Sequence, residues 1–187
     1  TNEPNTTASP ARRRFFQAGA ALSAATLVNQ GAQAAKSVHP DKVVSQEHWT
    51  TRDSDGASIE LFMWRKMIPG LINKASKGTI LFVHGSSMAG TPVFDLQVPG
   101  KPQYSTMDHF ARLGFDTWCL DNEGYGRSSK SRSINFNIAN GADDLAAVSA
   151  YILKTTKQKQ LMLYGLSSGA LKAALFAERF PERVNRI

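Results

Sequence analysis

The sequence predicts an α/β protein with a mostly parallel sheet and an antiparallel hairpin at its N-terminal end. Three short, continuous apolar runs support this prediction, because strands buried on both faces of a parallel sheet have that pattern; they are Thr79–Val83, Phe115–Leu120 and Leu161–Tyr164. Helix-like segments alternate with these runs. Such alternation favours right-handed crossovers between parallel strands.

Each remaining element follows from a local pattern. Two strand-like segments, Val43–Thr50 and Ser58–Lys66, flank the turn-forming residues Asp53–Gly56, which predicts the hairpin. Asp143 and Asp144 are expected to open the second of three helices, because carboxylates favour a helix N-terminus. The expected helices are Tyr104–Leu113, Ala142–Thr155 and Ser168–Arg179.

Composition indicates one ordinary globular domain. The 187 residues are 42% hydrophobic and 20% charged, which argues against a disordered chain. Cys119 is the only cysteine, so the sequence excludes an internal disulfide and predicts no structural zinc. The net charge is +7, of which residues 1–36 contribute three charges. The rest is only mildly basic, and we expect no nucleic-acid partner.

The first 34 residues have the layout of a secretory signal. Arginines at positions 12–14 and two phenylalanines precede an apolar stretch from Ala18 to Val28, and the small-residue pattern Ala32-Gln33-Ala34 follows. Consecutive arginines before Phe-Phe resemble a bacterial twin-arginine signal, which the machinery for export of folded proteins reads. We expect cleavage after Ala34 and a periplasmic or secreted protein without a stable membrane span, since a span needs ~20 apolar residues. An exposed basic tail before an amphipathic helix is the alternative.

Gly165-Leu166-Ser167-Ser168-Gly169 matches G-x-S-x-G, directly after an apolar strand and directly before a helix. A serine raised on such a tight turn needs small neighbours at both flanks, because a Cβ there would strike the adjoining strand or helix. Ser167 is therefore the candidate nucleophile. A glycine-rich connection with an incidental serine is the alternative.

Two other loops follow buried strands. In His84-Gly85-Ser86, the glycine lets the chain turn so that the backbone N–H of Ser86 can face an anionic oxygen. The N–H of Ser168, at the start of the helix, would be the second donor. A histidine in the position of His84 is more often a structural hydrogen-bonding residue than a general base. The segment Asp121–Ser128 closes the next strand.

These three motifs, in this order and on these elements, resemble the α/β-hydrolase family. Its members commonly carry His-Gly after the third strand, Asp-x-x-Gly-x-Gly-x-Ser after the fourth and the serine turn after the fifth. The resemblance covers residues 43–187 and implies a serine hydrolase that acts on small-molecule carboxylic esters through Ser167. It implies backbone oxyanion donors at Ser86 and Ser168, and a shaping role for Asp121–Ser128. No motif predicts a metal or an organic cofactor.

In the family's chain order, the nucleophile precedes an Asp or Glu and then a His. The chain ends at Ile187, 20 residues after Ser167, and its four histidines all lie upstream: His39, His48, His84 and His109. Glu178 and Glu182 lie on or just after the helix that follows Ser167, and we do not assign them as the acid. We expect residues 35–187 to be the N-terminal portion of an α/β-hydrolase domain, incomplete and nearly inactive alone.

Two other functions stay open. One is an enzyme of the same fold with non-ester chemistry, such as a perhydrolase or a C–C bond hydrolase. The other is a non-catalytic binding protein, which the missing acid and base favour. The apolar residues in the loop Ser87–Gln103 would either form a wall over the site or simply pack.

Overall fold

The structure is a computed structural model that describes residues 42–187, apart from the side chains of residues 73–75. The predicted signal, residues 1–34, and His39 lie outside the described residues. Within residues 42–187, six strands form one sheet in the order β1-β2-β4-β3-β5-β6. These strands are β1 Val44–Ser54, β2 Ala57–Met67, β3 Thr79–Val83, β4 Asp116–Leu120, β5 Leu161–Gly165 and β6 Val184–Arg186.

Pairing in the sheet confirms the predicted fold class. Strand β2 runs antiparallel to both of its neighbours, β1 and β4, whereas β4, β3, β5 and β6 run parallel to one another. Val83 at the end of β3 pairs with Gly165 at the end of β5. The loops that follow these two strands therefore start side by side at one edge of the sheet.

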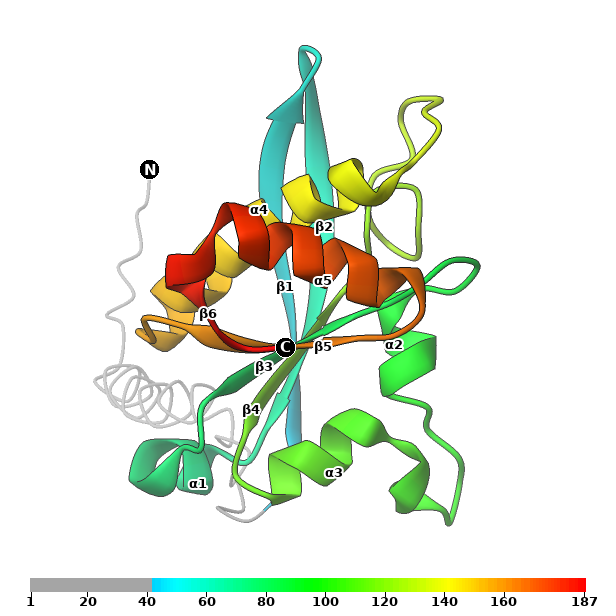
Figure 1. Cartoon of the computed structure of the whole chain (residues 1–187). Helices are drawn as coiled ribbons and strands as arrows, with labels where there is room; N and C mark the ends of the chain where they lie inside the picture. The colour runs from blue at the N-terminus through cyan, green and yellow to red at the C-terminus, as the bar shows by residue number, and fades with distance from the viewer. Residues whose placement is uncertain (1–41) are drawn as a thin grey trace, which may run out of the picture. The chain divides into compact units, whose positions relative to one another are not determined.

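Helices cover both faces of the sheet (Figure 1). Helices α4 (Ile138–Thr156) and α5 (Ser168–Arg179) lie on one face, and α2 (Gly90–Phe94) and α3 (Thr106–Arg112) lie on the other. Helix α1 (Pro69–Ala75) connects β2 to β3. Single 3-10 turns occupy Pro102–Tyr104 and Pro181–Arg183. No helix in the described part of the chain is long and apolar enough to span a membrane.

Apolar side chains on the two faces of the sheet form separate clusters. The larger lies under α4 and α5, where Trp118 and Phe176 are fully buried. The smaller lies under α2 and α3 and includes Phe82, Phe94 and Met107. Strands β3 and β4 are buried along their whole length, as continuous apolar runs predict.

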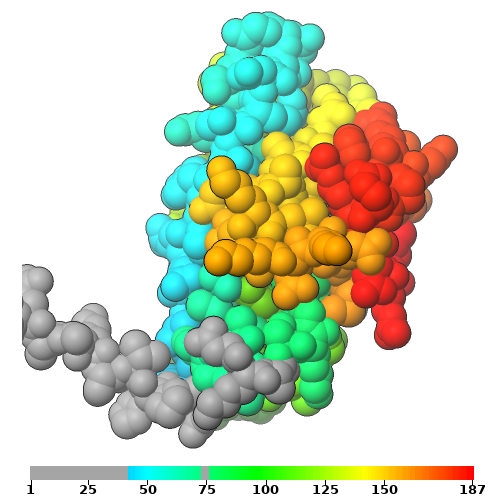
Figure 2. Space-filling view, turned by 90° about the vertical axis from the view of Figure 1, so that its left-hand side faces the viewer, coloured from blue at the N-terminus to red at the C-terminus, as the bar shows by residue number. Residues whose placement is uncertain are grey.

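The hairpin turn is tighter than the predicted four residues. Ser54 pairs with Ala57, so only Asp55 and Gly56 form the turn. Both have positive φ, 51° and 76°, which a two-residue type I′ turn requires and which Asp-Gly favours. Strand β1 therefore extends beyond the predicted end at Thr50. In Figure 2 the cyan tip of this hairpin projects at the top of the described residues.

The predicted start of the second helix is wrong. Helix α4 begins at Ile138, because Asn137 and Asn140 form a reciprocal capping box one turn earlier. Asp144 consequently lies inside the helix and is fully buried rather than at the N-terminus. The short helices α1 and α2 were not expected, since each spans at most seven residues.

Candidate active site

The turn at Ser167 has the strained geometry that G-x-S-x-G predicts. Ser167 lies between β5 and α5 with φ 55° and ψ −130°, a backbone conformation that costs a non-glycine residue about 1–3 kcal/mol. A Cβ at Gly165 would lie 2.6 Å from the backbone nitrogen of Ala170, and one at Gly169 would lie 2.8 Å from the His84 carbonyl oxygen. Both flanking positions therefore exclude larger residues, while the Ser167 side chain is exposed.

The loop after β3 packs directly against Ser167. A Cβ at Gly85 would lie 2.9 Å from the Ser167 Cβ and 3.3 Å from its Oγ, so only glycine permits this approach. The hydroxyl oxygens of Ser86 and Ser168 are 3.2 Å apart. The structure thus brings Ser86, Ser167 and Ser168 together where β3 leads toward α2 and β5 leads into α5 (Figure 1).

Two backbone donors are available beside Ser167. Among residues 42–187, no group accepts a hydrogen bond from the backbone N–H of Ser86 or of Ser168. Ser168 is the first residue of α5, whose aligned peptide dipoles favour negative charge at this end. Both N–H groups are therefore without an acceptor in the described part of the chain.

His84 has a structural role in the described fold. The backbone N–H of Asn122 donates to His84 Nε2 over 3.0 Å, so the ring proton is on Nδ1, which donates to the Gly85 carbonyl over 2.7 Å. The ring is fully buried, and this burial lowers the pKa of His84 to about 4. With both nitrogens engaged, the ring has no free atom with which to accept a proton from Ser167.

The segment Asp121–Ser128 forms a hydrogen-bonded loop behind the site. The Asp121 carboxylate accepts the backbone N–H groups of Gly90 and Arg127 over 2.8 and 2.9 Å. Gly126 has φ 49°, and a Cβ there would strike that carboxylate. These contacts connect the loop to α2 and agree with the shaping role that the resemblance implies.

A buried polar cluster under the site was missed in the sequence. Lys172 Nζ donates to the His84 carbonyl over 3.1 Å and to Asn122 Oδ1 over 2.9 Å. The amide of Asn122 donates in turn to Asp144 Oδ2 over 3.1 Å, and Arg52 Nε donates to Asp144 Oδ1 over 2.6 Å. Burial lowers the pKa of Lys172 to about 8 and raises the pKa of Asp144. The only sequence signal is a lysine on the apolar side of α5.

The described residues provide no acid–base partner for Ser167. His48 on β1 shares a hydrogen bond with the Tyr151 hydroxyl over 2.9 Å, and His109 lies exposed on α3. Glu178 and Glu182 are also exposed. From residue 42 to the end, no imidazole or carboxylate is hydrogen-bonded to the Ser167 side chain. Over the same residues, no His, Cys, Asp and Glu side chains group as metal ligands would.

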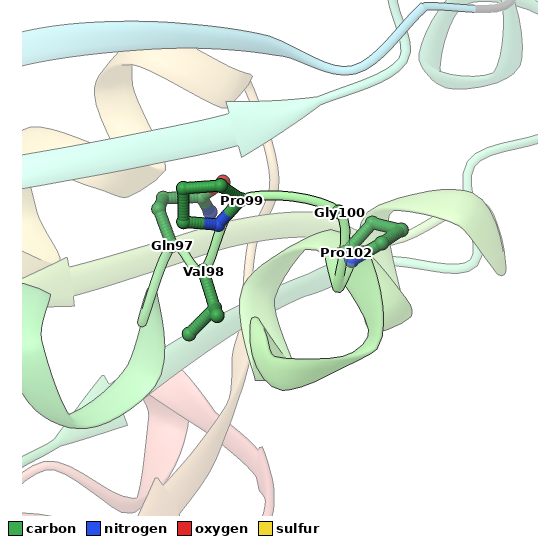
Figure 3. Close-up of a pocket in the computed structure, with 5 residues that line it drawn as sticks. All are labelled: Gln97, Val98, Pro99, Gly100 and Pro102. Atoms are coloured by element: carbon green, nitrogen blue, oxygen red, sulfur yellow. The ribbon is translucent and has the colours of Figure 1, made fainter.

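Only part of the loop Ser87–Gln103 packs on the fold, since Met88 and Leu96 are exposed. Phe94 is buried against Phe82 with ring centroids 5.1 Å apart, and Asp95 accepts hydrogen bonds from Trp64 and Lys66 over 2.8 Å each. Its distal part borders a cavity of about 400 Å³ (Figure 3), and Ser167 is not among the residues that line it. This cavity is lined by Gln97, Val98, Pro99, Gly100 and Pro102.

Structural comparison finds the same fold in solved hydrolases. A CIB-like hydrolase from Thermoplasma acidophilum has 18% identity and a TM-score of 0.52, with 76% of this chain and 60% of that chain covered. A probable hydrolytic enzyme from Pseudomonas aeruginosa PAO1 has 21% identity and a TM-score of 0.56, with 74% and 39% covered. An esterase from Pyrococcus furiosus has 18% identity and a TM-score of 0.52, with 76% and 48% covered. At these identities the likeness concerns the fold alone.

Sequence comparison assigns the family. No curated protein matches the chain. The chain spans 39% to 60% of the length of the first two solved structures above. A family model described as the alpha/beta hydrolase fold matches residues 78–187, which is more than half of the chain and includes the loops with Ser86 and Ser167. The chain therefore belongs to the α/β hydrolase fold family.

Proposed function

We propose that the protein is a serine hydrolase that acts on carboxylic esters, with Ser167 as its nucleophile. The observation that supports this most is the strained backbone of Ser167, with φ 55° in a turn where Gly165 and Gly169 exclude side chains. Strain of this kind persists where the surrounding structure imposes it, and it is typical of active sites. Here it leaves the hydroxyl exposed beside the Ser86 loop.

In this proposal, Ser167 Oγ attacks the ester carbonyl carbon, and a general base takes its proton. The N–H groups of Ser86 and Ser168 donate to the resulting oxyanion. When the tetrahedral intermediate collapses, the bond to the alcohol oxygen breaks, and the alcohol leaves with the proton. Water then hydrolyses the acyl-serine ester by the same steps. The base and its acid would lie beyond Ile187 in the whole protein, since the chain spans 39% to 60% of two solved hydrolases.

Ester hydrolysis by the complete protein tests the proposal. Ser167→Ala should lower kcat/KM for an activated ester at least about 10³-fold, because the nucleophile is lost. Ser168→Ala is the matched control: it removes an adjacent hydroxyl but keeps the backbone donor, so kcat should change only severalfold. Equal activity of the wild type and Ser167→Ala would contradict the proposal.

One observation favours a second candidate, a non-catalytic binding protein. Within residues 42–187, Ser167 has no base or acid partner, and a serine hydroxyl alone is a weak nucleophile. Complete inactivity of the whole protein toward esters, peracid formation and C–C cleavage would favour this binding function over both enzymatic ones.

We also propose export through the twin-arginine machinery, on the pattern of residues 12–34 alone. A reporter fused to residues 1–40 should reach the periplasm as a folded protein. Replacement of Arg12, Arg13 and Arg14 by lysine should stop export. A reporter that stays in the cytoplasm with the intact segment would contradict the proposal.

A further inference from the structure

Lys172 occupies a position where an apolar residue is expected. The buried positions of α5 are Gly169, Lys172, Ala173 and Phe176, which is the core-facing side of an amphipathic helix. Lys172 is 2% exposed. Burying an ammonium group is costly unless it gains hydrogen bonds or a counter-charge, so this position calls for an explanation.

Neighbouring residues form a close-fitting site for this side chain. A Cβ at Gly141 of α4 would lie 2.6 Å from Lys172 Cδ, so the glycine provides the space for the lysine stem. The rings of Tyr125 and Phe136 lie 5.8 and 5.2 Å from Nζ, where they favour a cation. The titratable groups that face Nζ are His84 from the end of β3, Tyr125 from the loop after β4 and Asp144 from α4.

The ammonium group hydrogen-bonds to the loop that approaches the nucleophile. The His84 carbonyl lies just beyond the paired part of β3, which ends where Val83 pairs with Gly165. A buried carbonyl at that point needs a donor, and Lys172 Nζ provides it over 3.1 Å. Asn122 Oδ1 accepts a second hydrogen bond from Nζ, and the Asn122 backbone N–H fixes the His84 ring.

We propose that Lys172 is a positioning residue that holds the His84–Ser86 loop in register with Ser167. The inference rests on the proposed function, because the loop matters through the oxyanion donor at Ser86. Lys172 reaches the loop from the same helix that begins beside Ser167, so it couples the two halves of the site. A displacement of about 1 Å in such a site can lower the rate about 10²-fold.

Kinetics of the complete protein provide the first test. Lys172→Met keeps the length of the side chain but removes the donor, so we expect kcat to fall tenfold or more with KM nearly unchanged. Lys154→Met, at an exposed position of α4, is the matched control and should leave both constants unchanged. In Gly141→Ala the new Cβ displaces the side chain of Lys172, so this variant should show the same loss in kcat. It serves as the test if Lys172→Met does not fold.

A spectroscopic test is independent of hydrolysis. Labelling with [1-13C]His and [15N]Gly marks the His84–Gly85 peptide, the single His-Gly pair in these 187 residues. Its carbonyl resonance should shift as pH rises through about 8, where the pKa of Lys172 lies, and should not shift in Lys172→Met. An unchanged resonance would overturn the proposal, as would an unchanged kcat in Lys172→Met when Ser167→Ala is inactive. If Ser167→Ala has no effect on hydrolysis, the proposed function fails. The pH dependence of the carbonyl resonance would then still show whether Lys172 contacts the His84 carbonyl.

Discussion

Two adjacent regions at one edge of the sheet are organised by different physical forces. The turn from Gly165 to Gly169 is fixed by sterics, within five consecutive residues, since a Cβ at either glycine would meet backbone atoms. The polar cluster beneath it is fixed by hydrogen bonds and charge among Arg52, Asn122, Asp144 and Lys172. Steric requirements leave a local sequence pattern, whereas a partnership between distant polar residues leaves none.

The largest expected effect is at the steric turn. Gly169→Ala would drive a Cβ into the Val83 carbonyl oxygen, and Val83 is held in place by the pairing of β3 with β5. We expect a loss of about 4 kcal/mol in the free energy of unfolding. Gly100→Ala is the control: nothing lies within 4 Å of its Cβ, so only its φ of 73° costs about 1 kcal/mol. Equal losses of unfolding free energy in the two variants, measured by urea denaturation, would contradict the steric explanation.

Two neighbouring aspartates of α4, one buried and one exposed, test how much the buried ion pair contributes to stability. Asp144→Asn removes the buried charge that pairs with Arg52, and we expect a loss of about 3 kcal/mol in unfolding free energy. Asp143 pairs with Arg179 at side chains that are 50% and 39% exposed, so Asp143→Asn should cost less than about 0.5 kcal/mol. Similar denaturation midpoints for the two variants would show that the buried cluster adds no stability.

The buried lysine should make stability depend on pH in the alkaline range. The pKa of Lys172 is lowered from 10.5 to about 8, so the unfolded chain binds this proton more tightly than the folded one. The folded state therefore gains stability as pH rises from about 8 toward 10.5, by about 2 kcal/mol at pH 10. Lys172→Met should lack this rise. Parallel stability curves for the two proteins would contradict the burial of a charged amine.

The smallest effect separates strain from chemistry at Ser167. Ser167→Gly should be more stable than Ser167→Ala by about 1 kcal/mol, because glycine adopts a φ of 55° without cost. Both variants should be equally inactive. Thermal unfolding of the two proteins measures the difference, and equal midpoints would mean that the turn stores no strain.

This contrast explains which features were predictable from the sequence. Continuous apolar runs located β3, β4 and β5, and the flanking glycines identified the turn at Ser167. The start of α4 differs from the expected Ala142 because the Asn137–Asn140 capping box begins the helix one turn earlier, which places Asp144 inside the helix. The role of Lys172 could not be predicted from the sequence, since it depends on contacts with the residue that follows β3 and with the loop after β4.

The central claim is that Ser167 is the nucleophile of a serine hydrolase. The most direct measurement is labelling of the complete protein with a fluorophosphonate, followed by mass spectrometry of its peptides. We predict one adduct per chain on Ser167 and none in Ser167→Ala, while Ser168→Ala is labelled as the wild type is. An unlabelled wild-type protein, or an adduct on Ser168 or another residue, would contradict the account.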